Sequence, residues 1–429
     1  MLNFEKHQDW PAVKAVCTTL QKSGYQAWLA GGCVRDALLG KTPQDFDVVT
    51  DAKPDEVEGL FVKTLSVGKS FGVMVVVMGE AHIEVATFRQ DRDYQDGRHP
   101  SQVDFLGPQA DALRRDFTVN ALFYNVQAQQ IVDYVNGQAD LHQRVVRTVG
   151  SARERFREDH LRMLRAIRFA AQLEFTITGE TLRALQKQRR DLLSLSGERI
   201  RQEFHKLFKA SAKNYGLALL LESGSAQILM PEWYDQVFKS WGAGVSNWVL
   251  IQTQISGMGQ SLGFSQFCAL LWWPMYEQGS VTWQTIKGVG RRWRFANQEQ
   301  KELHFYLQSM ALIALDRPDD VPRYLEILAA PGADFLRAWA HWWEGWLGRP
   351  LECWRRAETS AQTVLGAEGR LPAPLVTGED VMSFGFKGPE IRHQLMAIRD
   401  LQLVAKIVSR EDALAWLQSV AASEKVTQD

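Results

Sequence analysis

A glycine pair, Gly31-Gly32, constrains the fold of this chain more than any other feature, because it separates a predicted strand at 25–30 from a predicted helix at 34–39. Glycines at such a turn let backbone N–H groups approach an anion at the positive end of the helix. The same pattern also occurs as ordinary turn chemistry. The pair therefore predicts a strand–turn–helix unit that could bind phosphate.

Two aspartates, Asp45 and Asp47, follow this unit with one residue between them. On a strand they project from the same face. Two carboxylates beside a phosphate-binding turn are typical of a divalent-metal site for phosphoryl transfer, although the aspartates could also be a solvated strand end. Glu84 is the candidate third carboxylate, because it is the odd charge in an apolar strand predicted at 83–88. The alternative for Glu84 is an outward-facing position on a half-exposed sheet.

Charge, cysteine content and hydropathy limit the class of protein. The 429 residues include 49 Lys and Arg against 50 Asp and Glu, so any nucleic-acid site must be a local patch. The four cysteines are scattered without zinc-binding or disulfide spacing, which favours a reducing compartment. Neither a signal-peptide core nor a membrane-spanning apolar run is present, so we expect a cytoplasmic protein without membrane contact.

The pattern of elements changes near residue 148. Before it, helices are predicted at 9–23 and 54–61, strands at 73–78 and 83–88, and a polar, charged loop between Arg89 and Val103. This mixture indicates an α+β domain. After it the pattern is almost wholly helical, with helices predicted at 151–172, 179–190, 197–210 and 213–223. The tryptophans of 235–365 could pack a helical core or form a base-stacking surface.

Arginines supply the remaining chemistry. Arg114 and Arg115 precede an apolar helical run and could bind a triphosphate, or could be a solvated helix start. Asp159, Arg162 and Arg165 are spaced three apart, so neighbours would lie close together on one helix. An acid and a guanidinium there could contact the Watson–Crick edge of a base, or could simply form an ion pair. Arg168 continues the same series.

The stretch 144–209 is the local basic patch that the overall charge conceals. It contains 13 Arg and 3 Lys against 6 Glu and 2 Asp, so 16 − 8 leaves an excess of about +8. The preference for Arg over Lys favours phosphate contact, although a helical surface laced with salt bridges would have the same composition.

Taken in order, these motifs resemble the bacterial class II tRNA nucleotidyltransferase/poly(A) polymerase family of the DNA polymerase beta superfamily. The matching stretches are 31–36, 45–47, 83–89, 114–121, 158–162 and 196–200, and the tail segment 376–382 also resembles the C-terminal part of the family. The resemblance implies an α+β fold with a small mixed β-sheet in an N-terminal nucleotidyltransferase head. The head at 1–148 would be followed by a helical neck at 149–232, a body at 233–365 and a tail at 366–429.

The resemblance also implies roles for individual residues. Asp45 and Asp47 would bind catalytic Mg²⁺, and Glu84 stays the candidate third catalytic carboxylate on the strand pattern alone. The incoming nucleotide's triphosphate and sugar would contact the turn and two arginines, and its base would contact a protein template in the neck. The implied nucleotide-binding residues are Gly31, Gly32, Arg35 and Arg115 for triphosphate and sugar, and Asp159, Arg162, Arg165 and Arg168 for the base. Glu198 and Arg199 would brace the neck helices.

Within that family, transfer of CMP and AMP from CTP and ATP to the 3′ acceptor end of tRNA is the expected activity. CC-only members lack a flexible loop that the stretch 91–100 matches, which disfavours CC-only addition. Poly(A) polymerases have a sequence similar to Arg-Phe-Arg at the position where this chain has Ser70-Phe71-Gly72, which disfavours poly(A) synthesis. A-adding-only activity and poly(A) synthesis stay as alternatives. A non-catalytic RNA-binding protein is the alternative from another class, which the paired carboxylates argue against. The sequence leaves open whether the protein is a monomer or a homodimer.

Overall fold

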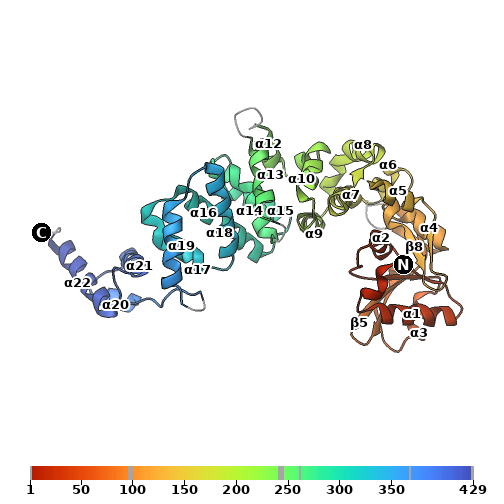
Figure 1. The fold of residues 1–429 in the computed structure, drawn as a ribbon, viewed down its shortest axis with the longest axis horizontal. Helices are drawn as coiled ribbons and strands as arrows, with labels where there is room; N and C mark the ends of the chain where they lie inside the picture. Colours follow the sequence, from red (N-terminus) through yellow and green to blue (C-terminus); the bar gives the residue numbers. More distant parts are fainter. Residues whose placement is uncertain (1, 95–99, 240–245, 260–261, 367–368, 427–429) are drawn as a thin grey trace. The chain divides into compact units, whose positions relative to one another are not determined.

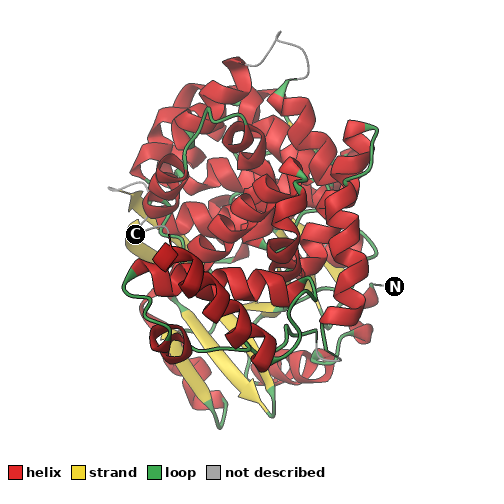
Figure 2. Cartoon of the chain, turned by 90° about the vertical axis from the view of Figure 1, so that its left-hand side faces the viewer, coloured by secondary structure: helices red, strands yellow, loops and turns green. Residues whose placement is uncertain are grey.

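The computed structural model describes residues 2–94, 100–239, 246–259, 262–366 and 369–426 (Figure 1). The chain divides into two compact units, one formed by residues 1–238 with 289–295 and the other by 239–288 with 296–429. All strands of the described chain belong to the first unit, and helices make up most of the remainder (Figure 2). The expected α+β class, a mixed sheet followed by a helical region, is confirmed.

A seven-stranded sheet organises the N-terminal part of the first unit, with the order β3-β4-β5-β2-β1-β8-β9. Its strands are β1 (Ala27–Ala30), β2 (Asp47–Thr50), β3 (Thr64–Gly68), β4 (Val73–Met78), β5 (Ala81–Thr87), β8 (Leu122–Asn125) and β9 (Gln130–Asp133). Neighbours are antiparallel except β2 and β5, which are parallel. That parallel pair sets the two predicted carboxylate strands side by side.

Short helices accompany this sheet. They are α1 (Trp10–Lys22), α2 (Gly32–Leu38), α3 (Pro54–Leu60), α4 (Pro108–Arg114) and α5 (Gly137–Gln143). In α1, Val13, Val16 and Leu20 are fully buried, as their helical spacing predicts. A further cluster joins Ala112 of α4 to Phe88 and Phe123, and so anchors the helix that carries Arg114.

The polar stretch predicted as a loop between Arg89 and Val103 is instead a two-stranded antiparallel ribbon. Strand β6 (Arg89–Tyr94) pairs with β7 (Pro100–Phe105) in a separate sheet. The prediction was wrong because these charged strands have no alternation of apolar and polar residues, which is the signal that identifies a strand. Residues 95–99, the centre of the expected flexible loop, lie outside the described residues.

The rest of the first unit is helical except for one short parallel pair, β10 (Val145–Val146) with β11 (Thr176–Ile177). Neither of these strands was predicted. The helices are α6 (Ala152–Glu158), α7 (Leu161–Leu173), α8 (Gly179–Gln188), α9 (Gly197–Phe208), α10 (Lys213–Glu222), α11 (Ser225–Leu229) and α12 (Pro231–Lys239), with the 3₁₀ turn η4 (Arg189–Ser194). The single helix expected at 151–172 is thus two helices, because Asp159 is extended, with φ −144° and ψ 107°.

The second unit is built of helices. They are α13 (Asn247–Gly257), α14 (Phe264–Glu277), most of α15 (Trp283–Arg292), α16 (Asn297–Leu315), α17 (Val321–Ala329), α18 (Ala333–Leu347), α19 (Glu352–Val364), α20 (Gly378–Ser383), α21 (Pro389–Leu403) and α22 (Arg410–Val426). Trp273, Trp339 and Trp354 are almost completely buried and pack the helices, as the core interpretation expects. Among the described residues, no helix has the length and apolar character that crossing a membrane requires. The division into head, neck, body and tail stays a prediction.

Candidate active site

One cavity in the first unit, of about 510 Å³, collects the residues that the sequence singled out. Every candidate site residue lines it except Arg168. The candidates in the lining are Gly31, Gly32, Arg35, Asp45, Asp47, Glu84, Arg115, Asp159, Arg162 and Arg165, and the wall also contains Arg89, Arg114, Asp116, Asn120 and Phe169. Residues more than a hundred positions apart therefore face the same space.

The turn between β1 and α2 brings the backbone close to a guanidinium. Gly31 has φ +75°, a conformation that side chains disfavour. A Cβ atom on Gly31 would lie 3.0 Å from Nη1 of Arg115 and 3.9 Å from Oδ2 of Asp47. The N–H of Gly31 donates to the carbonyl of Leu122 at 3.0 Å. Glycine is thus required here for both its dihedral angle and its small size.

Two strands supply the carboxylates. Asp47 begins β2, and its Cα pairs in register with that of Glu84 on the parallel strand β5. Asp45 precedes β2, and its side chain and that of Glu84 are exposed to the cavity. Burial, then the charges of Glu84 and Asp45, raise the pKa of Asp47 to about 6, against the opposing effect of Arg115. Glu84 and Asp45 are therefore close enough to disfavour the charge of Asp47, and a cation would relieve this repulsion.

This donor set fits a divalent cation that shares its ligands with a substrate. Carboxylate oxygens suit Mg²⁺, which usually takes one or two carboxylates together with substrate phosphates. Across the described ranges, no group of three or more His, Cys, Asp or Glu side chains is arranged to hold a metal by itself. Asp45 and Asp47 are the residues that could hold the ion, with Glu84 beside them.

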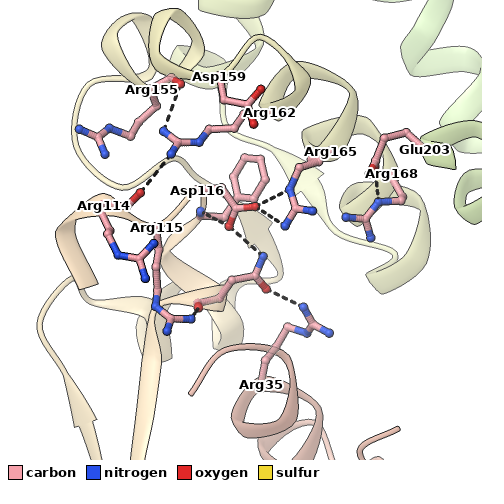
Figure 3. A network of polar contacts seen from close by, with 12 residues as sticks. Arg35, Arg114, Arg115, Asp116, Arg155, Asp159, Arg162, Arg165, Arg168 and Glu203 are labelled. Atoms are coloured by element: carbon pink, nitrogen blue, oxygen red, sulfur yellow. Dashed lines mark hydrogen bonds and ion pairs between the residues drawn. The ribbon is translucent and has the colours of Figure 1, made fainter. Parts of the chain in front are cut away.

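Arg35 also lines the cavity and is buried. Its Nη1 donates to Oδ1 of Asn120 at 2.5 Å, and its Nε donates to Asp36 at 2.8 Å. Nδ2 of Asn120 in turn donates to Asp116 at 3.2 Å. Figure 3 shows this chain of contacts continuing from Asp116 to Arg165. Arg35 is thus held in place through shared hydrogen bonds.

A single buried carboxylate orients the adjacent pair Arg114 and Arg115. Oδ1 of Asp111 accepts from Nε and Nη2 of Arg114 at 2.8 and 2.6 Å. Oδ2 accepts from Nε and Nη2 of Arg115 at 3.1 and 3.0 Å. Burial alone would raise the pKa of Asp111, but the charges of Arg115 and Arg114 outweigh it and the pKa is lowered. Neither arginine is therefore a loose, solvated helix start.

The base-selecting candidates Asp159 and Arg162 both line the cavity, but they do not form the ion pair that the sequence left open. Arg162 donates from Nη1 to Oε2 of Glu158 at 2.5 Å and from Nη2 to the carbonyl of Arg114 at 3.1 Å. Both carboxylate oxygens of Asp159 accept from Nη2 of Arg199 at 3.0 Å. The expected i,i+3 neighbourhood fails because Asp159 lies in the break between α6 and α7, not within a helix.

Arg165 joins the cavity wall to the core of the unit. It donates from Nε to Asp116 at 2.7 Å and lies over the ring of Phe169 at 5.2 Å. Burial would raise the pKa of Asp116, but the charge and hydrogen bonds of Arg165 prevail and hold the pKa at about 2. The Asp116–Arg165 pair is therefore charged at neutral pH.

Arg168, the fourth base-selecting candidate, lies outside this cavity lining. Its Nε donates to Oε2 of Glu203 at 2.6 Å, its Nη1 donates to Gln172 at 2.7 Å, and its guanidinium stacks 3.9 Å from the centre of the Phe169 ring. Arg168 is buried. A spacing of three residues moves the side chain progressively around a helix of 3.6 residues per turn, which is why the fourth member of the series turns inward.

Among the lining residues that were not singled out as site residues are Asp116, Asn120 and Phe169. The first two lie within the quoted stretch 114–121, where their polar character beside an arginine pair was a usable signal. The position of Phe169 in a helical run indicates only an apolar residue, yet the guanidinium groups of Arg35, Arg165 and Arg168 all lie within 5.3 Å of its ring centre. Nothing in the sequence distinguishes such a ring from an ordinary core residue.

Together these groups could place a polyanion between cations and a metal-binding carboxylate pair. Arg35 and Arg115 offer donors for phosphate oxygens. Asp159 and Arg162 offer an acceptor and a donor on another side of the cavity. The arrangement suits a substrate with a charged tail and a flat polar edge.

Comparison with known families identifies two segments. Residues 27–147 match the poly A polymerase head domain, and residues 174–236 match a segment described as a probable RNA and SrmB-binding site of polymerase A. The CCA-adding enzyme of Bacillus subtilis is 43% identical over 209 residues, which is 48% of this chain and 52% of that enzyme. That of Staphylococcus aureus strain MRSA252 is 44% identical over 197 residues, 46% of this chain and 49% of that enzyme. The chain thus matches about half the length of these curated relatives.

Solved structures resemble the chain over a longer range. The Bacillus stearothermophilus CCA-adding enzyme in complex with CTP has a TM-score of 0.77 and 26% identity, covering 98% of this chain and all of that one. The Thermotoga maritima CCA-adding enzyme complexed with tRNA has a TM-score of 0.63 and 18% identity, covering 96% of this chain and 95% of that one. The second likeness concerns the fold alone.

Proposed function

We propose that this chain, which belongs to the class II CCA-adding enzyme/poly(A) polymerase head family, transfers CMP and AMP from CTP and ATP to the 3′ end of tRNA. The product would be a new or repaired CCA terminus. The observation that carries the proposal is the single cavity in which the carboxylate pair, the guanidinium groups and the Asp159–Arg162 acceptor and donor meet. Two relatives that each match about half of the chain are CCA-adding enzymes.

In the proposed reaction, the 3′ hydroxyl oxygen of tRNA forms a bond to the α-phosphorus of the nucleotide. The bond from that phosphorus to the bridging oxygen breaks, and pyrophosphate leaves. Nucleotidyltransferases of this kind are typically metal-dependent, and Asp45 and Asp47 would hold Mg²⁺ here. Bound Mg²⁺ would activate the attacking hydroxyl and neutralise charge on the triphosphate. Glu84, the register partner of Asp47, would complete the negative wall.

Arg35 and Arg115 would bind the triphosphate. Both are already oriented by buried acceptors, so little side-chain entropy is lost when the substrate binds. Gly31 leaves room for Arg115 beside the turn, which keeps the guanidinium close to the carboxylate pair. These contacts do not distinguish one nucleotide from another.

Asp159 and Arg162 would make that distinction. Cytosine and adenine both present an amino donor beside a ring-nitrogen acceptor, whereas uracil and guanine present a carbonyl at the corresponding position. A carboxylate that accepts and a guanidinium that donates therefore suit CTP and ATP and disfavour UTP and GTP. Arg165 and Phe169 would border the same pocket.

The acceptor RNA would be recognised by backbone and shape. The excess of about +8 over residues 144–209 supports this, as does the match of 174–236 to an RNA-binding segment. The four cysteines are all free and buried, which supports the further proposal that the protein works in the reducing cytoplasm.

The test is extension of a tRNA transcript that ends at the discriminator base, with Mg²⁺ and CTP alone, ATP alone or both. Products are sized at single-nucleotide resolution. Addition of CC with CTP and CCA with both supports the proposal. Extension only by A on a tRNA ending in CC would indicate an A-adding enzyme, and long A tracts on unstructured RNA would indicate a poly(A) polymerase. If no RNA end were extended, the enzyme assignment would fail.

A further inference from the structure

A second cavity in the first unit, which we call the α6–α8 cavity, lies between those two helices and has a volume of about 560 Å³. Four cations line it. Arg153 and Arg157 come from α6, and Arg183 and Lys187 come from α8. Each pair is spaced i,i+4, so its members share one face of their helix. The cavity is therefore bordered by two cationic rows on neighbouring helices.

Among the described residues these four cations have no partner, unlike the arginines of α7. Arg162, Arg165 and Arg168 each pair with a carboxylate. By contrast, the four cavity cations are exposed, and within the described ranges none makes a hydrogen bond or ion pair. Like charges at i,i+4 repel one another and destabilise a helix. An anion bound in the cavity would offset that repulsion.

The other polar groups of the α6–α8 cavity are also compatible with a bound anion. Glu180 and Asp191 also line it, so four cations against two carboxylates leave an excess of 4 − 2 = 2 positive charges. Gln188 lines it as well, and its side-chain Nε2 and Oε1 are buried without a hydrogen-bond partner among the described residues. A buried amide without a partner is unfavourable. Its N–H₂ group could donate to an anionic oxygen.

We propose that the α6–α8 cavity binds backbone phosphates of the RNA substrate, at a site separate from the nucleotide cavity. This inference rests on the proposed function. The exposed cations come from successive turns of two helices, α6 and α8, and such a double row suits a chain of phosphates better than a single small anion. Helix α6 leads directly into Asp159, so RNA held on α6 would be anchored next to the base-selecting residue.

The first experiment measures binding of a tRNA transcript lacking CCA to the full-length protein, across a series of salt concentrations. The double variant Arg183→Gln/Lys187→Gln removes two cavity cations. The control Arg190→Gln/Lys209→Gln removes two exposed cations of the same basic stretch that lie outside the cavity lining. We expect the cavity variant to bind tRNA about tenfold more weakly, with a salt slope lowered by about 2, and the control to change much less. Equal effects of the two variants would overturn the proposal.

CTP binding to the same variants separates this inference from the proposed function. Both variants should bind CTP like the wild type, which also shows that they are folded. If the wild type bound tRNA but the cavity variant bound it equally well, only the present inference would fail. If the wild type neither bound nor extended tRNA, the proposed function itself would fail.

A second experiment distinguishes RNA phosphates from a free anion. Lys187 is the lysine of the cavity lining, and its acetylation by an amine-specific reagent can be followed by mass spectrometry. We expect tRNA to protect Lys187 and to leave Lys209 reactive. Protection by millimolar inorganic phosphate or pyrophosphate, without protection by tRNA, would indicate a small-anion site and would contradict the RNA assignment.

Discussion

Nη2 of Arg199 lies 3.0 Å from each carboxylate oxygen of Asp159, across the gap between α9 and the α6–α7 break. Oδ1 of Asp159 also accepts from the N–H of Leu161 at 3.0 Å. Two hydrogen-bond donors, the guanidinium of Arg199 and the N–H of Leu161, therefore orient the proposed base-selecting carboxylate. Its orientation depends on a residue forty positions further along the chain.

Replacing Arg199 should consequently impair base selection more than catalysis. In Arg199→Gln the carboxylate loses a charge-assisted contact of about 1.5–3 kcal/mol, so discrimination against UTP and GTP should fall about tenfold or more. Single-nucleotide incorporation with each of the four triphosphates measures this. Arg199→Lys should restore part of the selectivity. Arg201→Gln on the same helix is the control, since Arg201 donates to the carbonyl of Arg294. A uniform loss for all four nucleotides would indicate a purely structural role.

Asp159→Ala should lower nucleotide selectivity while leaving triphosphate binding intact. The carboxylate accepts from the base in the proposed complex, whereas the triphosphate contacts Arg35 and Arg115. Relative kcat/KM for CTP, ATP, UTP and GTP gives the selectivity, and inhibition by inorganic tripolyphosphate reports the triphosphate site. Unchanged discrimination between the cognate and non-cognate nucleotides would contradict the template role.

Asp45→Ala should abolish extension, with a loss on the order of 10³-fold or more, because it removes one member of the proposed metal-binding pair. Extension by the wild type should likewise stop with EDTA and return with Mg²⁺. Asp51→Asn is a matched control, since Asp51 directly follows β2 and its carboxylate accepts from the N–H of Gln26 at 2.7 Å. Full activity of Asp45→Ala would remove this residue from the mechanism.

Gly31→Ala should weaken nucleotide binding by displacing Arg115, because the added Cβ would lie 3.0 Å from its Nη1. The positive φ adds about 1–3 kcal/mol of backbone strain. Gly40→Ala shares the positive φ, but its Cβ would meet nothing within 4 Å. We therefore expect a higher KM for CTP only in Gly31→Ala, while both variants lose thermal stability. Identical KM values would show that Arg115 does not need this space.

Asp116 should make stability depend on pH in the acid range. Its pKa is lowered from 3.8 to about 2 in the folded state, so its contribution is fully present above pH 4 and is lost as the pH falls towards 2. The shift corresponds to about 2 kcal/mol. The melting temperature of Asp116→Asn should lie below that of the wild type at pH 5, and the difference should shrink below pH 3. A constant difference across this range would show that the charge of Asp116 is not responsible.

Local patterns predicted several elements and failed at others for identifiable reasons. The β-branched run Val73–Met78 is β4 with the bounds expected, and the apolar spacing of α1 correctly located its buried face. The helix break at Asp159 was not predicted, because helical periodicity continues in the sequence on both sides of it. In the structure the side chain of Asp159 accepts a hydrogen bond from the N–H of Leu161. The ribbon β6–β7 was not predicted, because its pairing depends on backbone hydrogen bonds between charged segments.

The candidate site was predictable residue by residue, but its internal contacts were not. The motifs around Arg115 and Asp159 predicted these two as site residues. It could not show that Asp111 orients Arg115 or that Arg199 holds Asp159, because those partners are chosen by the tertiary packing. For the same reason the sequence could not show that Arg165 lines the cavity whereas Arg168 contacts Glu203.

The buried carboxylate of Asp116 has a consequence for exchanging parts between related proteins. It accepts from Asn120, which holds Arg35 of the N-terminal sheet region, and from Arg165 of α7. In a chimaera that joined the sheet region of one relative to the helices of another, the acid, the amide and the first guanidinium would come from one parent. The guanidinium of α7 would come from the other. Such a hybrid should fold and bind nucleotide only when both parents supply the matching acid, amide and guanidinium, whatever their similarity elsewhere.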